Sequence, residues 1–336
     1  MGYLDFYKLP DEEKQDIFNS VEYATGLPPF AVEKDWWVVR TLEIIFETGI
    51  APHLVFKGGT SLSKAWDLID RFSEDLDLAL DKSFLGFSEE LTRKKEVNKL
   101  RRASYKYVSE SFYPQLQEGF KSKGFEGIEI NLGEVTSTDQ DPLILEIYYP
   151  ALTKQSDYVQ PSVLVEIGSR SLREPFSEKS IQSDIGREFS DQSFVDVPIT
   201  IPTVNPERTY LEKLFLLHEE FQRPQEKIRV NRLSRHLYDI YQIAQTEYAQ
   251  RAIQDLGLYR SIVKHRSVYT RFGRVDYESH FPPNLNPIPP EEMLSEWEQD
   301  YRIMQAQMIY GESLPFNKLV DEISKITDSI NQLKFK

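Results

Sequence analysis

The pattern of apolar and polar residues changes several times in the first quarter of the chain. Apolar residues at helical spacing over 33–48 predict a long amphipathic helix. A short apolar run at 54–56 stops at a Gly-Gly pair at 58–59, which predicts a strand followed by a turn. Helical spacing returns over 61–69. Strict alternation over 75–81 then predicts a second strand, with leucines on one face and aspartates on the other.

A charged region and a β-rich region follow. Residues 88–122 predict a long charged helical segment, and residues 168–206, rich in Ser and Pro, predict irregular extended connections. Between them, β-type patterns predict three strands, at 127–132, 143–149 and 163–167.

The C-terminal part is helical in pattern. A first helix starts at Pro206 with Asn205 as its N-cap, and later helices are expected at 233–244, 297–308 and 316–333. The whole pattern predicts an α+β protein. Its expected parts are N-terminal helices packed on the core (1–50), the core itself (51–200) and a C-terminal helical domain (205–336).

Composition narrows the class of protein. The chain has 336 residues and 40% apolar residues, enough for one large or two moderate folded domains. It has no cysteine, which excludes disulfides, thiolate metal sites and a cysteine nucleophile. The N-terminus lacks the layout of a signal peptide, and no apolar run approaches the ~20 residues of a membrane span. We therefore expect a cytoplasmic protein with no membrane partner.

Charge is distributed unevenly. The formal net charge of −14 argues against broad nucleic-acid binding. However, the stretch from Arg93 to Lys106 holds seven Lys or Arg and one Glu, and residues 223–235 are also basic. Either the first stretch is a solvated helix or it binds a polyanion, and in the second case Lys99, Arg101 and Arg102 are candidate RNA contacts.

Two carboxylates on one strand face are the first chemical signal. Asp75 and Asp77 are two residues apart, so their Cα atoms lie roughly 6.5–7 Å apart. Such a pair is costly without a cation between the two groups. Glu146 and Glu166 are each the lone acid in a predicted apolar strand, where a carboxylate must face water or a cation. The pattern leaves open which of them joins the aspartates.

The Gly-Gly turn is the second signal. Gly58 and Gly59 leave backbone N–H groups at a helix start, where Thr60 and Ser61 add hydroxyls. Such a turn suits phosphate oxygens. A phosphate-binding turn beside a carboxylate pair indicates nucleoside triphosphate chemistry.

These residues carry a family resemblance. The segment FKGGTSLSKAW…RFSEDLDLAL resembles the signature of the AbiEii/AbiGii toxin family of nucleotidyltransferases, minimal members of the DNA polymerase β-like superfamily. LVEIGSR at 164–170 looks like the third acidic strand of that family. ERTYLEKLFLLHEE at 207–220 and RLSRHLYDIYQI at 232–243 look like its two C-terminal motifs. The resemblance spans about residues 30–245.

The resemblance implies a fold and a set of site residues. The fold is a polymerase β-like core, a mixed sheet flanked by helices, with a C-terminal helical domain. Mg²⁺ or Mn²⁺ would be held by Asp75, Asp77 and Glu166. The NTP would be bound by Lys57, Gly58, Gly59, Thr60, Ser61, Arg71, Ser73 and Lys213. Asp239 would orient Lys213 or the nucleotide, and the substrate cleft is expected between the sheet and helical domains.

Two local alternatives stay open. Arg71 either helps to bind phosphates or forms a structural salt bridge with Asp70 or Glu74. Arg235 and Asp239 have the spacing of an ordinary exposed pair on a helix, worth ~0.3–0.5 kcal/mol.

The implied function is nucleotide transfer from an NTP to an RNA acceptor, with the 3′ end of tRNA as the leading acceptor. The context would be a toxin–antitoxin or phage-defence system with a cognate antitoxin. Two other functions are kept open: transfer to a protein hydroxyl, and a non-catalytic nucleotide-binding or partner-binding module. The choice of NTP and the oligomeric state do not follow from the residues.

Overall fold

The computed structural model describes residues 2–73, 75–87, 91–134, 137, 140–154, 160–270, 273 and 275–334, with backbone alone for residues 2–4. Contacts within the chain divide it into two compact units. The first comprises Met1–Trp66 and Phe72–Val204, and the second comprises Asp67–Arg71 and Asn205–Lys336. The second unit therefore includes a five-residue segment whose last residue, Arg71, is four positions before the start of the expected carboxylate strand.

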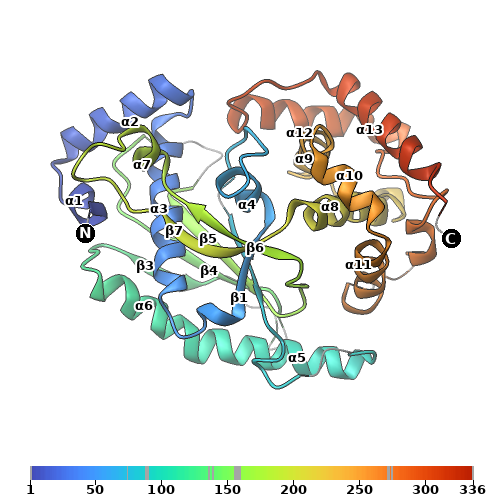
Figure 1. Ribbon diagram of the computed structural model, residues 1–336, viewed down its shortest axis with the longest axis horizontal. Coiled ribbons are helices and arrows are strands. Elements are labelled where there is room, and N and C mark those ends of the chain that lie inside the picture. The colour runs from blue at the N-terminus through green and yellow to red at the C-terminus, as the bar shows by residue number, and fades with distance from the viewer. Residues whose placement is uncertain are drawn as a thin grey trace. The chain divides into compact units, whose positions relative to one another are not determined.

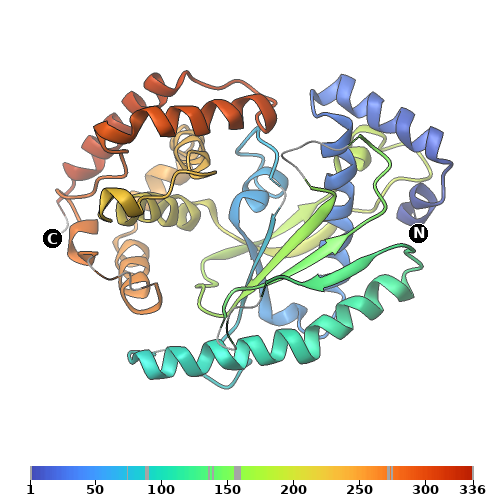
Figure 2. The ribbon, with the colours of Figure 1, turned by 180° about the vertical axis from the view of Figure 1, so that it is seen from behind.

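The first unit is built on a seven-stranded mixed sheet with strand order β3-β4-β5-β2-β1-β7-β6 (Figures 1 and 2). The strands are β1 (Leu54–Lys57), β2 (Asp75–Leu80), β3 (Glu129–Leu132), β4 (Leu143–Tyr148), β5 (Ser162–Gly168), β6 (Phe176–Ile181) and β7 (Ile199–Val204). The central strand β2 pairs antiparallel with β1 and parallel with β5. Strands β1, β2 and β5, which carry the candidate site residues, thus lie side by side in the middle of the sheet.

Helices surround this sheet. They are α1 (Gly2–Tyr7), α2 (Asp11–Thr25), α3 (Pro29–Phe46), α4 (Gly58–Lys64), α5 (Lys94–Tyr107), α6 (Tyr113–Ser122) and α7 (Asp184–Glu188). A π-helical turn, Val108–Phe112, joins α5 to α6, so one helical run extends from 94 to 122 (Figure 2). Residues 88–90, where this helical region was expected to begin, lie outside the described residues.

Helix α3 differs from the amphipathic helix that was predicted. It is buried on nearly every side, because helices of the same unit and the sheet both pack against it. Its charged residues are buried with partners: Arg40 pairs with Asp196 at 2.8 Å, and Glu33 accepts hydrogen bonds from the backbone of Leu152 and Thr153. Paired charges allow a sequence with polar positions to occupy a core.

The prediction of irregular structure over 168–206 is wrong. This region contains β6, α7 and β7, and β7 lies beside β1 with Phe56 paired to Thr203. Strand β6 is at the sheet edge and carries mostly polar residues, and β7 contains Pro202, which disfavours a strand reading. Strand β6 therefore shows no apolar alternation, and in β7 the proline interrupts the alternation begun by Ile199 and Ile201.

The second unit is helical. Its helices are α8 (Pro206–Phe221), α9 (Arg235–Ala244), α10 (Glu247–Gln254), α11 (Leu256–Tyr269), α12 (Leu294–Gln307) and α13 (Phe316–Asn331). The predicted helices at 233–244, 297–308 and 316–333 correspond to α9, α12 and α13. A mixed sheet flanked by helices, followed by a helical region, confirms the predicted α+β class.

No helix in the described ranges combines the length and the apolar character needed to cross a lipid bilayer.

Candidate active site

The carboxylates expected at the site share one face of the sheet. Asp77 on β2 is paired in register with Glu166 on β5, and Asp75 precedes Asp77 by two positions. Paired residues on neighbouring strands point to the same side, as do residues two apart on one strand. Glu146 is on the same face but on β4, one strand farther from β2, and it accepts a hydrogen bond from the Tyr148 hydroxyl at 2.8 Å. The register therefore favours Glu166 over Glu146 as the third carboxylate.

Gly58 is required by the position of Asp77. A Cβ atom at Gly58 would lie 1.9 Å from Asp77 Oδ2, and its φ of +83° is in the left-handed region. The carboxylate thus packs directly against the backbone where α4 begins. On the other side, Lys57 Nζ lies 3.7 Å from Asp77 Oδ1. Asp77 is held between a glycine backbone and an ammonium group.

The hydroxyls next to the glycines brace this turn. Thr60 donates to the Asp75 carbonyl at 2.6 Å and lies 3.0 Å from the Ser73 hydroxyl, while Ser61 donates to the Gly58 carbonyl at 2.8 Å. Thr60 and Ser61 are both buried. The Thr60 hydroxyl ties the turn to Asp75, which starts β2, and the Ser61 hydroxyl stabilises the turn itself through Gly58.

The residues around Asp77 fit a hard cation by donor chemistry, since Asp75, Asp77 and Glu166 offer only carboxylate oxygens. Within the described ranges, no three Asp, Glu, His or Cys side chains converge closely enough to form a preformed metal site. Mg²⁺ is commonly bound by one or two carboxylates together with substrate phosphates, and an all-protein cage is not needed. The arrangement suits a metal ion whose ligands come partly from the protein carboxylates and partly from the phosphates of a bound nucleotide.

A small pocket of about 110 Å³ borders Asp77 and Glu166, and Arg170 lines it. Arg170 Nε donates to Asp141 Oδ2 at 3.1 Å, and its Nη2 donates to the Asp141 carbonyl. Neither Arg170 nor Asp141 stands out in the pattern of apolar and polar residues. A local signal existed, because Arg170 follows Glu166 by four positions just after a strand, but its partner 29 positions away was not visible.

In the second unit, Asp239 binds two cations. Arg71 Nε lies 2.7 Å from Asp239 Oδ1, Arg71 Nη2 lies 2.8 Å from Oδ2, and Lys213 Nζ lies 2.8 Å from Oδ2. All three side chains are buried. The group has one more positive than negative charge, which suits an anionic ligand. His236 Nδ1 is 3.4 Å from Lys213 Nζ.

Burial and neighbouring charge shift the titration of this group. Burial opposes ionisation of Asp239, but Arg71 and Lys213 hold its pKa well below the usual range. Burial, with Arg71 as a nearby like charge, lowers the pKa of Lys213 although Asp239 opposes the shift. Burial also lowers the pKa of His236 well below its usual value, and Lys213 adds to that shift.

One expectation about this group is corrected, and a partner of Arg71 is added. Asp239 is not part of an exposed pair with Arg235, because its side chain is fully buried against Arg71 and Lys213. Arg71 binds Asp239, a partner that was not expected, and Glu74, one of the two partners that were, lies outside the described residues.

The two basic stretches differ in structure. On α5, Lys95, Lys99, Arg102 and Lys106 are exposed and spaced by four, three and four residues, which places them on one helix face. We call this set the α5 basic stripe. Val97, Leu100 and Ser104 are buried on the opposite side, and Arg101 is half-buried.

In the stretch 223–235, Arg223 and Arg229 both bind the buried carboxylate of Glu220, at 2.7 and 2.6 Å. Glu220 therefore neutralises part of the positive charge of this second stretch. The α5 basic stripe is therefore the better candidate for binding a polyanion.

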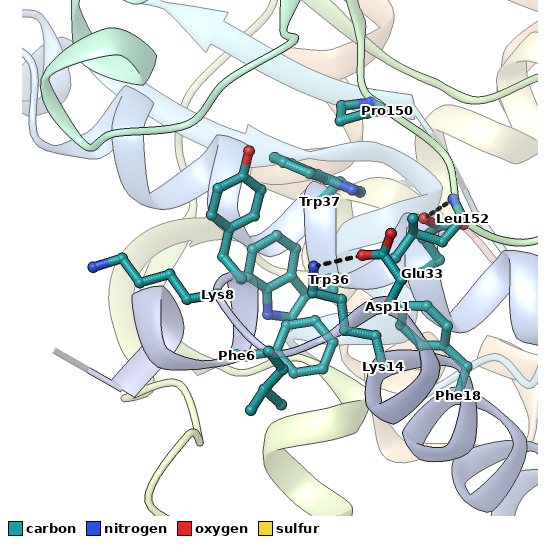
Figure 3. Close-up of a pocket in the computed structure, with 12 residues that line it drawn as sticks. Phe6, Lys8, Asp11, Lys14, Phe18, Glu33, Trp36, Trp37, Pro150 and Leu152 are labelled. Carbon is teal, nitrogen blue, oxygen red and sulfur yellow. Dashed lines mark hydrogen bonds and ion pairs between the residues drawn. The ribbon is translucent and has the colours of Figure 1, made fainter.

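A larger pocket of about 400 Å³ lies among the N-terminal helices (Figure 3). Figure 3 shows Phe6, Trp36 and Trp37 around it, with Lys14 bound to Asp11 at 3.3 Å. Trp36 and Trp37 are 3% and 4% exposed and their ring centroids lie 4.9 Å apart, so both are core residues. The pocket contributes no residue to the carboxylate site.

Comparisons with known proteins agree with the motifs. Residues 40–323 match the family described as nucleotidyl transferase AbiEii toxin, type IV TA system. Seven solved protein chains match. Among them is MenT4, a nucleotidyltransferase toxin from Mycobacterium tuberculosis H37Rv, with 19% identity, a TM-score of 0.45 and coverage of 94% of this chain and 99% of that chain. A search of curated protein sequences finds no match. Because the family match covers most of the chain, from before β1 to within α13, this protein belongs to the AbiEii family of nucleotidyltransferase toxins.

Proposed function

We propose that this nucleotidyltransferase transfers a nucleotidyl group from an NTP to a hydroxyl of an RNA acceptor, with the 3′ end of tRNA as the leading acceptor. The observation that carries the proposal is the pairing of Asp77 with Glu166 directly beside Gly58. Carboxylates from adjacent strands share one face there beside a backbone turn, a combination of groups that suits phosphoryl transfer.

In the proposed reaction, the acceptor oxygen forms a bond to the α-phosphorus of the NTP. The bond from that phosphorus to the bridging oxygen of the β-phosphate breaks, and pyrophosphate leaves. The hydroxyl proton passes to water or to a carboxylate of the site. Mg²⁺ or Mn²⁺ bound by Asp75, Asp77 and Glu166 would stabilise the phosphate charge and promote loss of that proton.

The residues of the chain have distinct proposed roles. The backbone at Gly58 and Gly59 binds triphosphate oxygens, and Lys57 offers a positive charge beside Asp77. Thr60 and Ser73 keep the turn attached to the start of β2. These contacts position the phosphates before the reaction, which removes an entropic part of the barrier.

We assign Lys213 to the charge of the leaving pyrophosphate, with Asp239 and Arg71 as its positioning partners. Support comes from the buried group of two cations and one carboxylate in the second unit. A lysine whose pKa is lowered is also able to release a proton more easily than an ordinary lysine.

The RNA acceptor is supported by the α5 basic stripe. Although the protein has a net charge of −14, four exposed cations along one helix face create a local positive potential that attracts a phosphate backbone. The family's description as a type IV toxin–antitoxin nucleotidyltransferase supports the further proposal that a cognate antitoxin opposes this activity.

The test is transfer of label from each of the four α-³²P-labelled NTPs, with total tRNA and total cell protein as acceptors, with and without Mg²⁺ or Mn²⁺. We expect label in RNA, dependent on the metal. Asp77→Asn should reduce the rate by ~100-fold or more. Asp81→Asn is the matched control, since Asp81 directly follows β2 and pairs with Arg173 at 2.8 Å.

Label that entered protein in place of RNA would support the protein-hydroxyl alternative. Full label transfer by Asp77→Asn would show that the reaction does not use this site. No transfer to either acceptor would leave the non-catalytic module as the better description.

A further inference from the structure

The pocket beside the carboxylates has a charged wall. Its lining residues are Lys57, Asp77, Leu78, Asp141, Pro142, Glu166, Gly168, Arg170 and Ser171. Lys57 and Arg170 bring positive charge next to the two carboxylates. The Arg170 side chain is 29% exposed, whereas the Asp141 side chain that holds it is fully buried. A cation fixed by a buried carboxylate is placed at this wall.

Asp141 is itself held from several directions. Besides Arg170, it accepts a hydrogen bond from the Ser169 backbone at 3.0 Å, and the hydroxyls of Ser169 and Ser104 lie within 3.3 and 3.2 Å. Such a bonded carboxylate is rigid, so it restricts the guanidinium to few orientations. Arg170 is therefore positioned before any ligand arrives.

The pocket and the glycine turn lie on opposite sides of Asp77 along the strands. Lys57 is paired with Asp77, and Gly58 follows Lys57, so the turn lies toward the beginning of β2. Strand β5 is parallel to β2, so from Glu166 it continues toward the end of β2. It passes Gly168, which is paired with Ala79, and Arg170 follows just after it. In-line displacement at phosphorus places the attacking and leaving groups on opposite sides. With the triphosphate at the turn, the acceptor approaches from the side of Arg170.

Helix α5 links this pocket to the α5 basic stripe. Ser104 on its buried face contacts Asp141, which holds Arg170. The opposite face of the same helix carries the stripe of Lys95, Lys99, Arg102 and Lys106. One helix thus supports a cation at the pocket and presents four more to solvent. A chain of regularly repeated anions is the ligand that uses both features.

We propose that Arg170, positioned by Asp141, binds a phosphate of the RNA acceptor next to its reacting hydroxyl, while the α5 basic stripe binds phosphates farther along the same strand. Arg170 is in this view an acceptor-binding residue, and Asp141 and Ser104 are positioning residues. The inference rests on the proposed function, because it uses the location of the triphosphate at the glycine turn.

The first experiment measures affinity for deacylated total tRNA without NTP, and affinity for a non-hydrolysable NTP analogue without RNA. Arg170→Met should weaken tRNA binding by ~10- to 100-fold, the range of a charge-assisted hydrogen bond, and leave analogue binding within ~2-fold. Arg170→Lys should be intermediate, since it keeps the charge without the two-point contact to Asp141. Arg173→Met is the matched control, because Arg173 is also paired with an aspartate but does not line the pocket.

Arg170→Met leaves Asp141 buried without its arginine, so a second variant guards against misfolding. Arg170→Met combined with Asp141→Asn keeps the pair neutral and should show the same loss of tRNA affinity. The stripe variant Lys99→Ala/Arg102→Ala/Lys106→Ala should reduce the slope of log affinity against log salt by about 2–3. Lys318→Ala/Lys325→Ala on α13, which removes two exposed lysines, should leave that slope unchanged.

The outcomes separate this inference from the proposed function. Unchanged tRNA affinity in both Arg170 variants, or an equal loss of analogue affinity, would overturn the assignment of Arg170 to the acceptor. Wild-type protein that binds tRNA through Arg170 but never labels it would contradict only the proposed reaction. Wild-type protein that does not bind tRNA would overturn both.

Discussion

The Arg71 guanidinium and the Asp239 carboxylate form a two-point ion pair, with Nε–Oδ1 at 2.7 Å and Nη2–Oδ2 at 2.8 Å, and both side chains are buried. The two residues are 168 positions apart in sequence. Arg71 is the last residue of the segment Asp67–Arg71, which is part of the helical unit, and Asp75 is only four positions after Arg71. The pair therefore anchors the chain shortly before the carboxylate strand begins.

Asp239→Asn should lower the free energy of unfolding by about 3–5 kcal/mol, because it leaves the charges of Arg71 and Lys213 buried without their carboxylate. Urea unfolding followed by circular dichroism measures this change. Asp321→Asn is the control, since Asp321 is an exposed ion-pair residue whose loss should cost less than about 1 kcal/mol.

The pH dependence of this effect has a defined sign. The pKa of Asp239 is depressed in the folded protein, so its contribution is fully present above about pH 4 and is lost as pH falls further. The stability of Asp239→Asn should therefore change less than that of the wild type below pH 4. Parallel curves for the two proteins would contradict the ion-pair account.

Lys213 should limit activity at alkaline pH. Burial and the neighbouring Arg71 lower its pKa, so it loses its charge at a lower pH than an ordinary lysine. If that charge assists the leaving pyrophosphate, the rate of label transfer should decline as the pH rises, and the decline should begin before pH 10.5, the ordinary pKa of a lysine. Lys213→Arg keeps a positive charge at all these pH values, so the alkaline decline should move upward. Superimposable pH–rate profiles would exclude Lys213 as the titrating group.

Gly58→Ala should abolish most of the activity. The new Cβ would meet Asp77 Oδ2 at 1.9 Å, so the carboxylate has to move, and the positive φ adds backbone strain of about 1 kcal/mol. Gly86→Ala is a matched control, because Gly86 has a φ of +80° but no atom within 4 Å of the added Cβ. Gly58→Ala should lose at least as much stability as Gly86→Ala in thermal unfolding, and only Gly58→Ala should lose label transfer. Equal activities would show that the position of Asp77 does not matter.

A buried charge group in the first unit predicts a separate pH effect on stability. Lys64 Nζ lies 2.8 Å from Asp35 and 2.7 Å from Asp184. Burial and the nearby Asp184 raise the pKa of Asp35 to about 6, although Lys64 opposes the shift. The folded protein then binds more protons than the unfolded chain between about pH 4 and 6, so stability should fall as pH rises through this range.

Asp35→Asn should flatten that pH dependence, as measured by urea midpoints from pH 4 to 7. Asp16→Asn serves as a control, since Asp16 is an exposed aspartate on α2. A wild-type profile already flat over this range would contradict the raised pKa of Asp35.

Local patterns were sufficient for the elements that carry the chemistry. Alternation over 75–81 identified β2 and the shared face of Asp75 and Asp77, and the Gly-Gly pair identified the start of α4. Both signals are contained within a few neighbouring residues, where backbone conformation follows residue type. The same reasoning missed β6 and β7, whose pairing in the sheet compensates for polar residues and a proline.

The sequence by itself determined the fold class, the paired aspartates, the glycine turn and, through its motifs, the family. The motifs also grouped Glu166 with the two aspartates and Asp239 with Lys213. Only the tertiary structure decided that Arg71 binds Asp239, that Arg170 binds Asp141 and that Arg40 binds Asp196. The physical reason is that a buried charge must find a partner, and the partner is chosen by strand register and helix packing between segments far apart in the chain. Such distances in sequence leave no local pattern to read.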